Sequence, residues 1–261
     1  MDGMKKAAAV LAPYLKGAST LPPQPTTTQS SDNEYRCAIC HDLEWLHPLG
    51  PDGEPQYHLA VPCGCLIRAM QQRASSPEYQ RQQGARPAAQ KFDNYRVDLK
   101  GGNRDAYVAT KAWAETTPFV WLLIYGGVGN GKSHLCNAAL LTLLGRRVKA
   151  KLVTAAGILS ALRRGIETHT TDDLMAEYQQ MPTLIIDDLG AGMKHPSEKG
   201  SEWEWARMEE LLVFRYENVM PTMCCTNLDL PDLPERIRSR FGDRELSRIV
   251  ENKAEDYRGK K

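Results

Sequence analysis

Long apolar runs are missing from this chain of 261 residues. No stretch approaches the roughly 18 apolar residues that a membrane-spanning helix needs. Residues 4–12 imitate the start of a signal peptide, but Pro13 and Lys16 cut the apolar segment short and no hydrophobic region follows. These absences argue against a membrane protein and against secretion, and they indicate an intracellular protein.

Internal repeats, long low-complexity tracts and an excess of charge of one sign are also missing. The 33 Lys and Arg residues nearly balance the 32 Asp and Glu residues, which gives a formal net charge of +1. This total neither indicates nor excludes a nucleic-acid partner, because acidic residues elsewhere can hide a basic face. A hydrophobic content of 42% and a charged content of 25% are close to globular averages and argue against wholesale disorder.

Composition divides the chain into four regions. Residues 1–33 contain a candidate helix at 4–16 and a linker rich in Pro, Thr and Ser. Residues 34–70 form a turn-rich module with four cysteines, and residues 71–100 form a second, polar linker. Residues 101–261 are expected to form a larger α/β domain.

The larger domain alternates between two kinds of segment. Apolar segments occur at 119–125, 149–154, 183–186 and 222–226, and amphipathic segments occur at 132–144, 157–166, 172–180, 202–218 and 234–241. Apolar strands that alternate with amphipathic helices are typical of a parallel sheet covered by helices.

A phosphate-binding loop is the most specific motif of the sequence. Residues 126–133 read GGVGNGKS and match G-x-x-x-x-G-K-[ST] between a predicted strand and a predicted helix. Glycines let successive backbone N–H groups converge on phosphate oxygens, Lys132 would neutralise the β and γ phosphates, and Ser133 would bind Mg²⁺. The expected nucleotide-binding residues are Gly126, Gly127, Val128, Gly129, Asn130, Gly131, Lys132, Ser133 and His134.

Polar residues follow the next strands of the predicted sheet. After the apolar run 184–186, Asp187 would hold Mg²⁺, directly or through water, and Asp188 would polarise the attacking water. Asn227 ends the strand at 222–226 and could contact the γ-phosphate or the lytic water, although a plain turn residue is the alternative. Arginines 236, 238 and 240 crowd one short helix, where a solvated basic face competes with a role in phosphoryl transfer.

These landmarks carry a family resemblance. The stretches FDNY (92–95), GGVGNGKS (126–133), IDDLG (186–190) and ERIRSR (235–240) resemble, in order and spacing, the AAA+ ATPase domain of DnaC/DnaI-type replicative helicase loaders. IstB-type transposition helper ATPases are close relatives of that group. The resemblance implies ATP and Mg²⁺ as cofactors, Asn227 as first sensor and Arg240 as an arginine finger that acts on a neighbouring subunit. It also implies Arg258 in the second sensor position and a reduced or absent helical lid.

The same resemblance implies an extra element for single-stranded DNA within residues 157–180. The cations near it that could follow a phosphate backbone are Lys149, Lys151, Arg163, Arg164, Lys194 and Lys199. A solvated charged surface stays the alternative for each of them.

The cysteine module is expected to bind zinc. Cys37 and Cys40 form a C-x-x-C pair, Cys63 and Cys65 form a C-x-C pair, and four thiolates at such spacings can close a tetrahedral zinc site. His41 or His58 could replace one sulfur. Four protein ligands leave no open position for catalysis, so the zinc would be structural.

The resulting prediction is an ATP-dependent loader of a hexameric, DnaB-type replicative helicase. The loader would bind the helicase through the cysteine module, self-associate through AAA+ contacts, and help place the ring on single-stranded DNA in a bacterial cytoplasm, as a bacterial or phage protein. Direct DNA binding by the module is a minority alternative. For the whole chain, the alternatives are an IstB-like helper ATPase, a DNA adaptor that hardly hydrolyses ATP, and a P-loop kinase. Asn227 and the arginine-rich helix disfavour the kinase because they fit hydrolysis between subunits.

Overall fold

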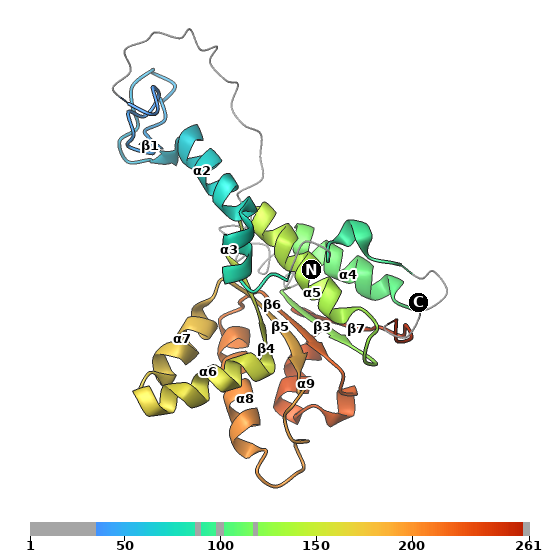
Figure 1. The fold of residues 1–261 in the computed structure, drawn as a ribbon. Helices are drawn as coiled ribbons and strands as arrows, with labels where there is room; N and C mark the ends of the chain where they lie inside the picture. The colour runs from blue at the N-terminus through green and yellow to red at the C-terminus, as the bar shows by residue number, and fades with distance from the viewer. Residues whose placement is uncertain (1–34, 87–89, 98–101, 117–119, 258–261) are drawn as a thin grey trace.

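The computed structural model describes residues 35–86, 90–97, 102–116 and 120–257 (Figure 1). The expected helix at 4–16 and Arg258 lie outside these residues. In the described part of the chain, no helix is both long and apolar enough to span a membrane.

A five-stranded parallel sheet forms the centre of the larger domain. Its strands are β3 (Trp121–Tyr125), β4 (Ala150–Thr154), β5 (Thr183–Leu189), β6 (Thr222–Thr226) and β7 (Ser247–Glu251). They lie in the order β4-β5-β6-β3-β7. The four predicted strands and their parallel arrangement are confirmed, whereas β7 was not predicted.

Helices cover both faces of the sheet, as Figure 1 shows. Leu122 and Ile124 of β3 point to the face covered by α4 (Arg104–Thr116) and α5 (Lys132–Gly145). Trp121 and Leu123 point to the opposite face. That face is covered by α6 (Ala155–Thr168), α7 (Thr171–Gln180), α8 (Glu202–Glu217) and α9 (Glu235–Phe241). All five predicted helices are present, and α4 is additional. Since both faces are covered, β3 has to be apolar along nearly its whole length.

Arg215 of α8 fixes the position of α7 from inside the core. Its guanidinium is fully buried and donates to the carbonyls of Tyr178, Met181 and Pro221. A further bond runs from its Nε to Thr222 Oγ1 at 2.9 Å. Burial lowers the pKa of Arg215 to about 9. Backbone carbonyls, rather than a carboxylate, satisfy this buried cation, so Arg215 has a structural role.

The cysteine module lies at the N-terminal end of the described chain. β1 (Trp45–Leu46) and β2 (Val61–Pro62) pair antiparallel beside the four cysteines, and α2 (Gly64–Ser75) begins directly after them. α2 and α3 (Pro77–Gln82) then lead to the larger domain, where α2 lies against the C-terminal end of α5. In Figure 1 the module stands at the far end of α2, away from the sheet. The expected region boundary at residue 70 therefore falls inside a helix.

Candidate nucleotide site and cysteine cluster

The phosphate loop joins the end of β3 to the start of α5. Two of its glycines have no room for a side chain: a Cβ on Gly126 would lie 2.3 Å from the carbonyl oxygen of Asn252, and one on Gly129 would lie 1.8 Å from Asp256. Both glycines also have positive φ angles, of 137° and 76°, which other residues rarely adopt. The loop is therefore packed tightly against the segment that follows β7, and α5 begins directly at its end.

Lys132 lies inside the loop and is 4% exposed. Its Nζ donates to the carbonyls of Gly126 at 2.7 Å and Gly127 at 2.6 Å, and to Asn130 Oδ1 at 3.1 Å. Burial lowers the pKa of Lys132, and the nearby carboxylates oppose that shift. An ammonium group held by loop carbonyls is positioned where phosphate oxygens can replace those acceptors.

Asp187 lies near the carboxyl end of β5 and is fully buried. Burial raises the pKa of Asp187, helped by the neighbouring Asp188, while a hydrogen bond from the Ser133 hydroxyl and the charge of Arg86 oppose that rise. The structure therefore brings together Ser133 and Asp187, the two predicted Mg²⁺ ligands. A hydroxyl and a carboxylate are oxygen donors, which suit this hard cation.

Arg86 was not predicted as a site residue. Its Nη2 lies 2.9 Å from Asp187 Oδ2, and its backbone N–H donates to Asn137 Oδ1 of α5 at 2.7 Å. Arg86 comes from the polar stretch predicted as a linker, where no motif points to a functional residue. Only the fold, which places this stretch beside β4 and β5, identifies it.

Asp188 and Asn227 meet at the carboxyl edge of the sheet. Asn227 Nδ2 lies 3.4 Å from Asp188 Oδ1, so the expected water-polarising carboxylate and the expected sensor lie next to each other. Asp188 has a φ of 54°, an unfavourable angle for a residue with a side chain. The two side chains come from β5 and β6, which are neighbours in the sheet.

Asn252 is a second residue that the sequence did not reveal. Its Nδ2 donates to the carbonyl of Asn130 at 2.9 Å, and Asn130 Nδ2 donates to the carbonyl of Asn252 at 2.7 Å. Both residues are buried. This reciprocal pair ties the phosphate loop to the chain that leaves β7.

A pocket of about 460 Å³ adjoins the phosphate loop. Tyr95 and His134 form part of its lining and meet edge to face, with ring centroids 5.1 Å apart. The other lining residues are Asn94, Arg96, Gly129, Gly131 and Tyr257. Burial raises the pKa of Tyr95 to about 12, so its hydroxyl keeps its proton. Aromatic faces and polar side chains beside a phosphate loop are suited to a nucleobase.

Arg240 lies on α9, on the face of the sheet covered by α8. Its Nη1 donates to the carbonyl of Arg236 at 2.8 Å, and its guanidinium lies over the ring of Tyr216 at 5.6 Å. Within the described residues, no contact joins Arg240 to the phosphate loop of its own chain. The structure therefore does not bring Arg240 together with Lys132 and Asp187, and a role in a neighbouring subunit stays a prediction.

The cations expected to contact DNA differ in their ion pairing. Lys151 pairs with Glu177 at 2.6 Å, and Arg163 pairs with Glu204. Lys149, Arg164, Lys194 and Lys199 are exposed. Helices α6 and α7 occupy the predicted stretch between β4 and β5. Intramolecular ion pairs thus reduce the charge that Lys151 and Arg163 can offer to a phosphate backbone.

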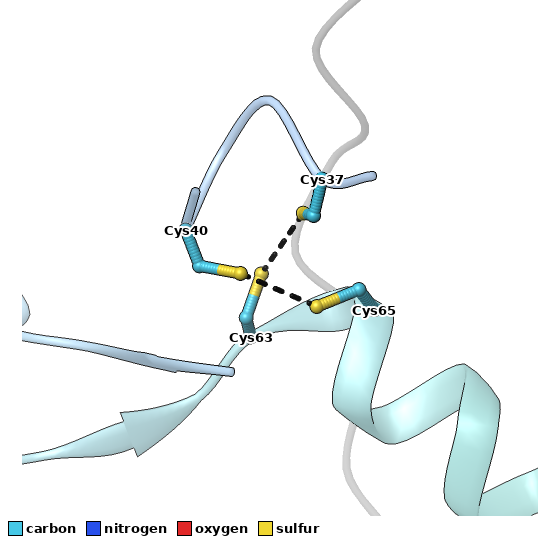
Figure 2. Close-up of side chains that lie close together, drawn as sticks. All are labelled: Cys37, Cys40, Cys63 and Cys65. Carbon is cyan, nitrogen blue, oxygen red and sulfur yellow. Dashed lines mark hydrogen bonds between the residues drawn. The ribbon is translucent and has the colours of Figure 1, made fainter. Parts of the chain in front are cut away.

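The four module cysteines form one cluster, which Figure 2 shows. Cys37 Sγ lies 3.8 Å from Cys63 Sγ, and Cys40 Sγ lies 3.3 Å from Cys65 Sγ. Four thiolates bound to zinc at about 2.3 Å would place their sulfurs about 3.8 Å apart. The Cys37–Cys63 distance matches this value and the Cys40–Cys65 distance is shorter, so the four cysteines would have to spread slightly to hold a tetrahedral zinc ion. His41 and His58 are exposed and do not belong to the cluster.

Hydrogen bonds in the cluster shift the pKa values of its thiols in opposite directions. Backbone N–H groups of Cys40 and Ile39 lower the pKa of Cys37 to about 6, whereas a hydrogen bond with the Cys40 thiol, together with burial, raises the pKa of Cys65 to about 12. Zinc binds thiolates rather than thiols. The backbone around Cys37 therefore favours the form that a metal ion requires.

The phosphate loop, the acidic pair near the end of β5 and the polar residue after β6 meet at the carboxyl ends of the parallel strands, and together they define a P-loop ATPase domain of the AAA+ class. The bacterial DnaA ATPase domain is the family that matches, over residues 88–244, and the chain belongs to this family. The predicted AAA+ class is thereby confirmed. Membership of the loader group within that class stays a prediction.

Similar proteins are DnaA initiators and a helicase loader. The chromosomal replication initiator DnaA of Limosilactobacillus reuteri (strain DSM 20016) is 31% identical over 144 residues, which are 54% of this chain and 32% of that protein. The chain thus spans about a third of the length of this curated relative.

Two solved structures share the fold. Replication initiator DnaA bound to AMPPCP and single-stranded DNA has a TM-score of 0.54 at 22% identity, covering 63% of this chain and 50% of that one. The DnaC helicase loader has a TM-score of 0.52 at 20% identity, covering 63% of this chain and 97% of that one.

Proposed function

We propose that the chain is an ATP-dependent loader that places a hexameric replicative helicase on single-stranded DNA. Such a loader would have a nucleotide site that is completed by a neighbouring subunit, a zinc-binding module that docks the helicase, and a surface that binds DNA. The observation that carries the loader role is that a DnaA-type ATPase domain is joined through α2 to a cysteine module with an apolar surface.

ATP and Mg²⁺ fit the residues of the nucleotide site. Lys132 and the loop amides would bind the β and γ phosphates, while Ser133 and Asp187 would hold Mg²⁺, which neutralises charge on the phosphate oxygens. Asp188 would orient the attacking water and accept its proton, and Asn227 would keep the Asp188 carboxylate in place. The nucleobase would lie in the pocket that Tyr95 and His134 help to line.

Arg240 would complete the site of a neighbouring subunit. Its contacts with Tyr216 and the carbonyl of Arg236 hold the guanidinium at the end of α9. Neither partner is a carboxylate, so the charge of Arg240 stays available for a developing negative charge elsewhere. Hydrolysis would then depend on self-association.

The helicase-docking surface is proposed on the cysteine module. Among large apolar side chains of the described residues, most exposed ones belong to this module, and they include Leu43 (75% exposed), Tyr57 (76%) and Leu49 (68%). An exposed apolar patch of this kind marks a protein partner. Its occupant would be the helicase, because the nucleotide and DNA sites lie on the ATPase domain.

Single-stranded DNA would bind along α6 and α7. Arg164, with Lys149 nearby, forms no ion pair with the described residues, so both would follow the phosphate backbone, and salt would weaken the binding. A similarly folded DnaA holds single-stranded DNA, which supports a DNA partner for this chain without identifying the contact residues.

A pull-down with the full chain tests the loader role. The wild-type chain should recover a replicative helicase from a lysate of the source cells or of the phage-infected host. Leu43→Asp should reduce recovery at least tenfold, and the control Val108→Asp, at an apolar residue of α4 that is 49% exposed, should not. Recovery of a transposase instead of a helicase would favour an IstB-like helper ATPase.

A single-turnover assay with single-stranded DNA separates a loader that hydrolyses ATP from an adaptor that only binds it. The loader should convert its bound ATP when DNA is added, whereas the adaptor should retain it.

A further inference from the structure

Residues 83–86 form a short strap that lies along β4, at the edge of the sheet. Leu152 N donates to the carbonyl of Gln83 at 2.8 Å. Gly84, with a φ of 89°, lies so close that an added Cβ would be 1.9 Å from Leu152 O. Ala85 N donates to the carbonyl of Gln80, which joins the strap to α3. The strap thus has a fixed register against the sheet.

The strap ends inside the nucleotide site. The backbone N–H of Arg86 is held by Asn137 of α5 at 2.7 Å, and its side chain reaches Asp187 Oδ2 at 2.9 Å. Asn137 is itself fully buried and also donates to the carbonyl of Gln90 at 2.9 Å. Arg86 is therefore aimed at Asp187 by its backbone and does not reach it as a loose surface side chain.

The two oxygens of Asp187 have different partners. Oδ1 accepts from the backbone N–H of Asp188 at 3.1 Å and lies 3.7 Å from the thiol of Cys136. Oδ2 accepts a hydrogen bond from the guanidinium of Arg86. A buried carboxylate without a cation is costly, and the guanidinium offsets that cost. Mg²⁺ would need an oxygen of the same carboxylate, and two cations at one oxygen repel each other.

We propose that Arg86 is the resident counter-ion of Asp187, that Mg²⁺ must displace it, and that Arg86 thereby sets the Mg²⁺ concentration at which the site accepts Mg²⁺-nucleotide. This inference rests on the proposed nucleotide site. It adds a residue from outside the ATPase motifs that competes with the metal ion.

The position of Arg86 connects the metal site to the cysteine module. Cys65 lies on α2, α3 follows it, and the strap continues directly from α3 to Arg86. The path of the chain from the cysteine module to the metal site therefore runs through α2, α3 and the strap.

Nucleotide binding across a Mg²⁺ titration tests the proposal in the full chain, with a fluorescent ATP analogue as the probe. Arg86→Ala should lower the Mg²⁺ concentration at half-maximal binding about twofold to fivefold, the range for a partly exposed ion pair. Arg86→Lys, which keeps the charge but not the forked geometry, should fall between wild type and Arg86→Ala. Arg81→Ala is the matched control, because exposed Arg81 on α3 contacts the carbonyl of Pro77 and not the site.

The outcomes separate this inference from the nucleotide site on which it rests. An unchanged or higher Mg²⁺ midpoint in Arg86→Ala would overturn the proposal, since Arg86 would then be a structural partner or a phosphate ligand. Wild-type protein that shows no Mg²⁺-dependent binding would instead refute the nucleotide site. Thermal melting verifies that each variant folds. If Arg86→Ala does not fold, Arg86→Gln, which loses the charge but keeps a hydrogen-bond donor, takes its place.

Discussion

Replacing Asn252 by Ala should loosen the phosphate loop and destabilise the domain. Asn252 is 1% exposed. Its Nδ2 donates to the carbonyl of Asn130 at 2.9 Å, and its Oδ1 accepts from the backbone N–H of Ala254 at 3.2 Å. The truncation removes both bonds and leaves a carbonyl and an N–H buried without these partners.

Each buried polar group that loses its partner costs about 1–3 kcal/mol. Two such groups, with some relief from local relaxation, lower the free energy of unfolding of Asn252→Ala by about 2–4 kcal/mol. Nucleotide affinity should fall about tenfold, because part of the binding energy is then spent on ordering the loop.

Urea unfolding and nucleotide titration measure the two effects. Asn218→Ala is the control, because exposed Asn218 donates to the carbonyl of Phe214 on α8, far along the chain from the loop. Its free energy of unfolding should stay within about 0.5 kcal/mol of wild type. A loss below about 1 kcal/mol in Asn252→Ala, with nucleotide affinity unchanged, would refute the role given to the Asn130–Asn252 pair.

Three further variants address the proposed chemistry. Lys132→Ala should fold normally but abolish nucleotide binding, because the phosphates lose their mobile cation; titration with a fluorescent nucleotide measures this. Cys37→Ser combined with Cys40→Ser should lose one zinc per chain and with it helicase binding, while nucleotide affinity persists. Native mass spectrometry measures the zinc content, and a pull-down measures helicase binding. Full helicase binding without zinc would show that the module does not dock the helicase. Arg240→Ala should keep nucleotide binding but suppress hydrolysis, and mixing it with Lys132→Ala should restore some activity; no recovery in assemblies shown to be mixed would contradict action between subunits.

The sequence predicted the centre of the nucleotide site because parallel strands impose a simple geometry. The carboxyl ends of such strands meet at one edge of the sheet, so a polar residue after each apolar run falls near its counterparts. Lys132, Asp187 and Asn227 follow this rule and lie on three segments that meet at that edge. The cysteine cluster was predictable for a similar reason, since short spacings limit where the sulfurs can lie.

The unpredicted elements have weak local patterns. β7 is an edge strand in which only Val250 is buried, so it has no apolar run to mark it. Its partner β3 lies more than a hundred residues earlier in the chain. α4 buries mainly alanines together with Trp113, and small side chains give little hydrophobic contrast. A spacing of three and four between Ala106, Ala109 and Trp113 was the available signal for that helix.

Arg86 and Asn252 have no local signal at all, and the reason is physical. Each acts through a contact with a segment far away in the chain: Arg86 meets Asp187, and Asn252 meets Asn130. Neither requires a particular neighbour in sequence, so an arginine in a polar stretch and an asparagine after a short strand look like surface residues. Arg86 and Asn252 are positioned by the two edge strands of the sheet, since the strap lies on β4 and Asn252 follows β7. The phosphate loop and Asp187 are thus held from opposite edge strands, and a change at either strand can alter the site without contacting it.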